Sequence, residues 1–160
     1  GHIGQAVCHL GSRLGFEVTV IDDRPTFASA ARHPEAKRAI CGDIAEELAA
    51  LEIGPQTYVL IVTRGHRHDG SVLAACVKSP AVYIGMIGSR RKGALIRRTL
   101  LDEGHATREE IERVVSPIGV DIGAQSVEEI AVSIVAELVA VRRKGGLTAD
   151  AKNFIPGGKA

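Results

Sequence analysis

The sequence lacks three features that would place it in a specialised class of protein. Its three cysteines are widely spaced and odd in number, so they predict neither a disulfide framework nor a Cys-x-x-Cys metal site. It lacks an excess of one charge, and its formal net charge of +1 argues against a general nucleic-acid binder. It also lacks a signal peptide and any apolar run long enough to cross a bilayer. We therefore expect a cytoplasmic protein that binds neither nucleic acid nor a membrane.

What the sequence does contain is an alternation of helical and strand patterns. The chain has 160 residues, 45% of them hydrophobic, which is enough for one domain with a sizeable core. The apolar spacing predicts helices over 3–14, 44–51, 70–78, 88–103, 107–113 and 126–144, and strands over 16–21, 58–62 and 81–86. This order predicts a three-layer, Rossmann-like, doubly wound parallel sheet in a single domain, residues 1–145, followed by a flexible tail, residues 146–160.

The start of the chain matches the second half of a dinucleotide-binding fingerprint. Gly1 and Gly4 enclose His2 and Ile3 where a helix begins, and Asp22 ends the following strand. Such glycines let backbone N–H groups approach a phosphate, and the carboxylate accepts a hydrogen bond from a ribose hydroxyl. A lone G-x-x-G also occurs in ordinary turns. Because the fingerprint's first glycine and its preceding strand are missing, we expect that the first strand is absent from this chain.

Two neighbouring side chains bear on which dinucleotide would bind. Asp22 would repel the 2′-phosphate of NADP, which favours NAD. Arg24, two residues later, could swing over and accommodate that phosphate. We expect a preference for NAD if a dinucleotide binds at all.

Four polar segments are predicted to follow strands of the sheet. Parallel α/β sheets bind ligands at the carboxyl ends of their strands, so these segments are expected to line one cleft. They are residues 1–4, 22–25, 63–69 and 88–92.

The segment 63–69 supplies five candidate binding residues. They are Thr63, Arg64, Gly65, His66 and Asp69. One interpretation is an anionic ligand held by Arg64 and His66; the other is surface histidines with Asp69 capping the next helix. The His-x-His-Asp pattern lacks a third firm ligand elsewhere in the chain, so we expect no metal site.

The segment 88–92 combines Gly88, a hydroxyl at Ser89 and three cations at a predicted helix start. Cations there oppose the helix dipole, so they suggest an anion such as a phosphate or a pterin phosphate, held by Ser89 and Arg90. Alternatively, the cations point to solvent. Successive helical side chains separate by about 100°, which predicts that Arg90 faces the cleft and Lys92 faces water.

One further candidate lies in an irregular segment. Asp121 stands between Gly119 and Gly123. Its carboxylate either faces a ligand or closes an Asx turn that holds the loop.

Taken in order, these motifs resemble a known family. They are Gly-His-Ile-Gly at 1–4, Asp-Asp-Arg-Pro at 22–25, Thr-Arg-Gly-His at 63–66, Tyr-Ile-Gly-Met-Ile-Gly-Ser-Arg-Arg-Lys at 83–92, Pro-Ile-Gly-Val-Asp-Ile-Gly-Ala at 117–124 and Glu-Glu-Ile-Ala-Val-Ser-Ile at 128–134. The series is similar to the C-terminal Rossmann domain of the xanthine dehydrogenase accessory family, also called XdhC/CoxI, over residues 1–143.

The resemblance implies a maturation factor for molybdenum hydroxylases. Members of the family bind molybdenum cofactor (molybdopterin), protect it while its sulfido ligand is installed, and deliver it to the apo-enzyme. The implied partners are an apo molybdenum hydroxylase and a cysteine desulfurase, and we expect a homo-oligomer without turnover of its own. The chain departs from the family at two points: it lacks the Gly-Gly-Cys motif of the family's N-terminal domain, and Val127 replaces a frequent proline.

The fingerprint alone supports a second hypothesis, an NAD(P)-dependent oxidoreductase. Such an enzyme needs a substrate domain and an acid–base residue beside the nicotinamide. His66 is the only reasonable acid–base candidate, and no second domain is evident in the sequence. We therefore favour the cofactor chaperone and assign no catalytic residue.

Overall fold

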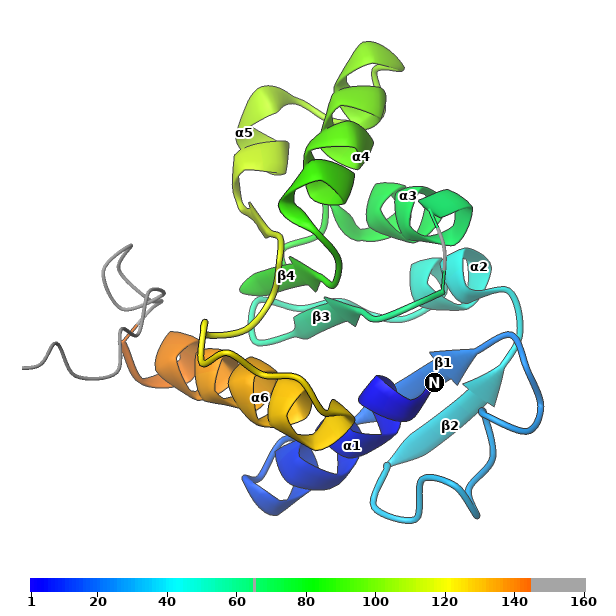
Figure 1. The fold of residues 1–160 in the computed structure, drawn as a ribbon. Helices are drawn as coiled ribbons and strands as arrows, with labels where there is room; N and C mark the ends of the chain where they lie inside the picture. The colour runs from blue at the N-terminus through cyan, green and yellow to red at the C-terminus, as the bar shows by residue number, and fades with distance from the viewer. Residues whose placement is uncertain (65, 145–160) are drawn as a thin grey trace, which may run out of the picture.

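The computed structural model describes residues 1–64 and 66–144 and shows a parallel α/β architecture (Figure 1). Its strands are β1 (Thr19–Asp22), β2 (Arg38–Cys41), β3 (Tyr58–Ile61), β4 (Tyr83–Met86) and β5 (Val114–Val115). Its helices are α1 (His2–Arg13), α2 (Ile44–Ala49), α3 (His66–Cys76), α4 (Arg90–Asp102), α5 (Arg108–Glu112) and α6 (Val127–Lys144). Across these described residues, no helix has the length and apolar character needed to span a bilayer. The predicted tail, residues 146–160, lies outside the described residues.

The strands form two parallel sheets. In one sheet β1 pairs with β2, and Thr19 lies opposite Arg38. In the other, β4 lies between β3 and β5, with Tyr58 opposite Tyr83. Parallel neighbours need a crossover connection, which α3 supplies between β3 and β4, and α4 with α5 between β4 and β5. The carboxyl ends of the strands in each sheet therefore lie along the same edge.

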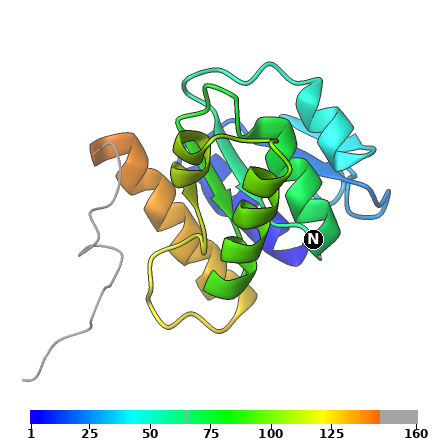
Figure 2. The ribbon, with the colours of Figure 1, turned by 90° about the horizontal axis from the view of Figure 1, so that it is seen from above.

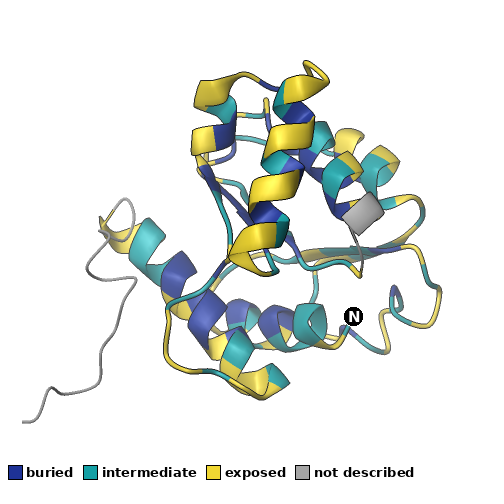
Figure 3. Cartoon of the chain, turned by 45° about the horizontal axis from the view of Figure 1, so that its top comes forward, coloured by how far each residue is buried: buried dark blue, intermediate teal, exposed yellow. Residues whose placement is uncertain are grey.

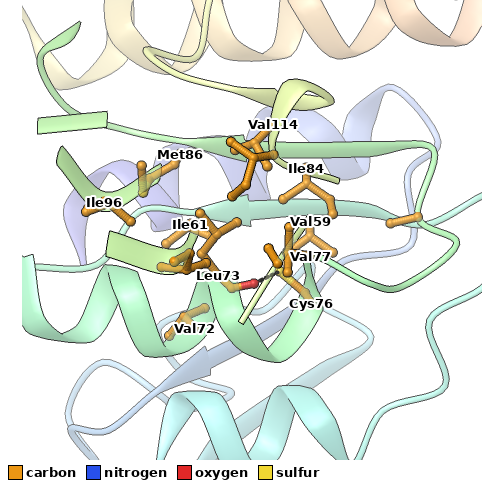
Figure 4. Close-up of a cluster of buried hydrophobic side chains, with 14 of the residues drawn as sticks. Val59, Ile61, Val72, Leu73, Cys76, Val77, Ile84, Met86, Ile96 and Val114 are labelled. Atoms are coloured by element: carbon orange, nitrogen blue, oxygen red, sulfur yellow. Dashed lines mark hydrogen bonds between the residues drawn. The ribbon is translucent and has the colours of Figure 1, made fainter. Parts of the chain in front are cut away.

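Helices cover both faces of the β3–β4–β5 sheet. α1 and α6 pack side by side on one face, and α3 and α4 lie on the other (Figures 1 and 2). Alternate residues of β3 serve the two sides: Val59 and Ile61 join the core cluster of α3 and α4, and Leu60 packs against that of α1 and α6. Figure 4 shows Val59 and Ile61 against Leu73 and Cys76 of α3, and Figure 3 shows buried residues on the inner helix faces. This three-layer arrangement confirms the predicted fold class.

Two short strands and one helix boundary differ from the prediction. The apolar patterns predict neither β2 nor β5, because β2 has exposed ends and β5 has only two residues. Helix α3 begins at His66, four residues earlier than expected, so half of the predicted 63–69 loop is helical. Asp69 in its first turn suits the positive end of the helix dipole.

The burial pattern predicts which leucines of the helices hold the layers together. Leu73 of α3 is completely buried against β3, so Leu73→Ala should lower the free energy of unfolding by about 2–5 kcal/mol. Leu95 of α4 is 60% exposed, and Leu95→Ala should change it little. Urea unfolding followed by far-UV circular dichroism measures both variants. Equal effects of the two substitutions would contradict this assignment of the core.

Candidate functional site

Polar and charged side chains follow the carboxyl ends of β1, β3 and β4, and we call this row the strand-end edge. Asp22 is the last residue of β1, Thr63 and Arg64 follow β3, and Gly88 follows β4. These are three of the predicted segments, and the helix start of the fourth, residues 1–4, touches Asp22. Two sets of contacts organise the edge, one around Asp22 and one around a buried ion pair.

Asp22 is held by Arg24 and by the start of α1. The Arg24 guanidinium donates from Nε to Oδ1 at 2.8 Å and from Nη2 to Oδ2 at 2.9 Å, and the Gly1 nitrogen donates to Oδ2 at 3.0 Å. Burial raises the pKa of Asp22, but the hydrogen bonds from Arg24 and the charged Gly1 nitrogen outweigh it and hold this pKa well below its usual range. Both carboxylate oxygens are occupied, so Asp22 could accept a ribose hydroxyl only if Arg24 moved away.

Three arginines surround the ring of Phe27. The guanidinium carbons of Arg24, Arg32 and Arg64 lie 3.8, 4.3 and 5.7 Å from the ring centroid. His2 meets the same ring edge-on, with centroids 5.7 Å apart. The motif analysis singles out neither Phe27 nor Arg32, because they lie in a segment without regular structure; the recurrence of arginine there is the signal that could have found them.

A buried ion pair connects the ends of β3 and β4. Asp69 of α3 is completely buried, the Thr63 hydroxyl donates to its Oδ1, and the Lys92 ammonium pairs with its Oδ2. The prediction that Lys92 faces water is wrong, since its side chain is only 14% exposed. A buried carboxylate needs a cation, and α4 begins close enough to supply one. The pair brings the predicted segments 63–69 and 88–92 together.

The start of α4 leaves its other cations on the surface. Ser89 is the N-cap, and its Oγ accepts a hydrogen bond from the Lys92 backbone N–H at 3.2 Å. Arg90 and Arg91 are exposed at the same helix end. Contact between a phosphate and Ser89 or Arg90 stays a prediction.

The remaining predicted residues fall into different environments. Ile3 packs against the core cluster of α1 and α6, whereas a Cβ at Gly4 would lie 3.4 Å from Val62, so this glycine allows α1 to approach the end of β3 closely. Asp121 is exposed and accepts from the Gly123 N–H at 3.4 Å, which matches the Asx-turn alternative. Gly65 and the side chain of His66 lie outside the described residues.

A groove of about 530 Å³ opens beside the strand-end edge. It runs along α1, and its lining includes His2, Gln5, His9 and Arg32. Two of these, His2 and Arg32, also contact Phe27. Among the residues that the structure describes, no three His, Cys, Asp or Glu side chains are grouped as metal ligands.

Parallel strands, covering helices and a polar strand-end edge define a Rossmann-type nucleotide- or cofactor-binding domain. The chain belongs to the XdhC Rossmann domain family, whose profile matches residues 1–138. This confirms the family indicated by the motifs.

Individual relatives are similar over most of this chain. It is 29% identical to a Bacillus subtilis protein named as a probable xanthine dehydrogenase subunit, and 28% identical to the molybdenum cofactor insertion chaperone PaoD of Escherichia coli, each over 86% of its length. The crystal structure of a xanthine dehydrogenase from Bacillus halodurans matches with a TM-score of 0.78 and 30% identity, covering 89% of this chain and 42% of that one. The chain spans 27–39% of the length of the curated relatives it matches.

The ion pair predicts an unequal effect of two neighbouring substitutions. Lys92→Met leaves Asp69 buried without a cation, so it should lower the free energy of unfolding by about 3–5 kcal/mol. Arg91→Met, at an exposed position of the same turn, should change it little. Adding Asp69→Asn to Lys92→Met should recover part of the loss. Urea unfolding measures all three variants, and equal stability of the Lys92 and Arg91 variants would disprove the role given to the pair.

Proposed function

We propose that this domain serves as part of an accessory protein for a molybdenum hydroxylase and binds molybdenum cofactor at the strand-end edge. The observation that carries the proposal is the group of guanidinium side chains gathered there on Phe27. Two comparisons support it: the membership of the XdhC Rossmann domain family, and the similarity to a relative named as a molybdenum cofactor insertion chaperone.

The donors at this edge suit the organic part of such a cofactor. A pterin phosphate is an anion that accepts hydrogen bonds, and guanidinium groups bind phosphate through paired N–H donors. Arg24, Arg64 and Arg90 would hold it, with the Ser89 hydroxyl and the turn at Gly88 beside them. The bound group would supply the molybdenum centre, while this chain would bind, orient and shield it.

The finer parts of the proposal rest on the family resemblance. They are a role during sulfuration of the cofactor, contact with an apo molybdenum hydroxylase and a cysteine desulfurase, assembly as a homo-oligomer, and a place in the cytoplasm. The boundary of the domain near residue 145 is likewise part of the proposal.

A second candidate function is NAD(P)-dependent oxidation and reduction. The observation that favours it is the start of α1 beside Asp22, with the Gly1 nitrogen 3.0 Å from the carboxylate. This is the arrangement that a dinucleotide fingerprint predicts for its diphosphate and ribose sites. The ion pair between Asp22 and Arg24 disfavours it, because the ribose position is already filled.

Binding of both ligands to the full-length protein distinguishes the two functions. We expect anaerobically prepared molybdenum cofactor to bind and then transfer to an apo molybdenum hydroxylase, while NAD and NADP bind weakly or not at all. Equilibrium dialysis, with molybdenum and pterin quantified, measures the first step, and recovery of hydroxylase activity measures the second. Tight binding of NAD(P) without binding of the cofactor would contradict the proposal and favour the oxidoreductase.

A further inference from the structure

The three arginines around Phe27 form a compact basic cluster, here called the arginine cluster: Arg24, Arg32 and Arg64. They come from two separate parts of the chain, the segment after β1 and the end of β3. Each guanidinium carbon lies within 6 Å of one ring centroid, a distance at which the ring attracts a cation. One aromatic ring thus holds three like charges close together.

The charges of the cluster are only partly neutralised. Asp22 and Asp23 both pair with Arg24, so the nearby carboxylates are directed at one arginine of the three. Among the described residues, neither Arg32 nor Arg64 makes a salt bridge. Like charges at this separation repel one another, and an anion between them would relieve that repulsion.

Unsatisfied donors face the same place. Arg32 contacts the His2 ring nitrogen through Nη2 at 3.2 Å, but its Nε is buried and has no hydrogen-bond partner. The adjacent start of α1 has no side-chain cap and no acidic residue in its first turn, so its backbone N–H groups are not covered by the protein's own side chains. A buried donor without a partner is costly, and a bound acceptor removes that cost.

We propose that the arginine cluster is a binding site for a phosphate monoester. A planar carboxylate matches one guanidinium fork, whereas the tetrahedral phosphate dianion presents oxygens in several directions and suits three donors that approach from different sides. Phe27 holds the guanidinium groups in place and covers one side of them. That the ester is a pterin phosphate rests on the proposed function; a nucleoside monophosphate offers the same chemistry.

The test measures phosphate binding by the full-length protein and its variants. Inorganic phosphate is titrated while the arginine Nε–H signals are followed by NMR, and affinity is measured by calorimetry. Arg64→Gln removes an exposed side chain that contacts only the ring, so the fold should be kept; the second variant combines it with Arg32→Gln. Arg98→Gln, on an exposed part of α4, is the matched control.

We expect phosphate to shift the Nε–H signals of Arg32 and Arg64, the Arg64 variant to bind about tenfold more weakly, and the double variant to lose more affinity still. The control should bind like the unchanged protein. No phosphate binding, equal affinity in the double variant, or an equal loss in the control would each overturn the site.

The same titration with a phosphorylated pterin and with AMP separates the site from the function. Weaker binding of either ester by the double variant supports the site and identifies its source. If the pterin phosphate binds and the double variant binds it equally well, the site is wrong and the cofactor function stands. If inorganic phosphate binds at the cluster but the pterin phosphate does not bind, the site stands and the cofactor function is wrong.

Discussion

The ion pair between Asp69 and Lys92 is the contact on which the strand-end edge depends. It joins the first turn of α3 to the first turn of α4, and these helices follow the neighbouring strands β3 and β4. The turn between β4 and α4 is shaped around it: Gly88 has a φ of +137°, and a Cβ there would lie 2.9 Å from the Lys92 side chain. A buried carboxylate without this cation would be unstable, so the two helix starts are fixed relative to each other.

This arrangement separates two kinds of charge at the edge. The charges in the interior, Asp69 and Lys92, neutralise each other and are unavailable to a ligand. The charges further out, at Arg32 and Arg64, gather on Phe27 without a carboxylate of their own. Structural and binding roles thus fall to different residues, which is why the outer arginines can be replaced in an experiment while the fold is kept.

Local signals predicted much of the fold, and long-range contacts explain what they missed. The capping box at Thr107 and Glu110 forms as expected, because both partners lie within one helical turn. Lys92 was assigned to solvent from its position on the helix alone, and only the distant Asp69 reverses that. Phe27 and Arg32 carry no periodic signal, so folding alone brings them to Arg64.

The most direct test of the account is a crystal structure of the full-length protein with molybdenum cofactor bound, located by the anomalous scattering of molybdenum. The account predicts the pterin phosphate within hydrogen-bond distance of Arg32 and Arg64, at the carboxyl ends of β1 and β3. A cofactor bound away from the strand-end edge, for example in the groove between α3 and α4 lined by Leu95 and Thr99, would contradict it.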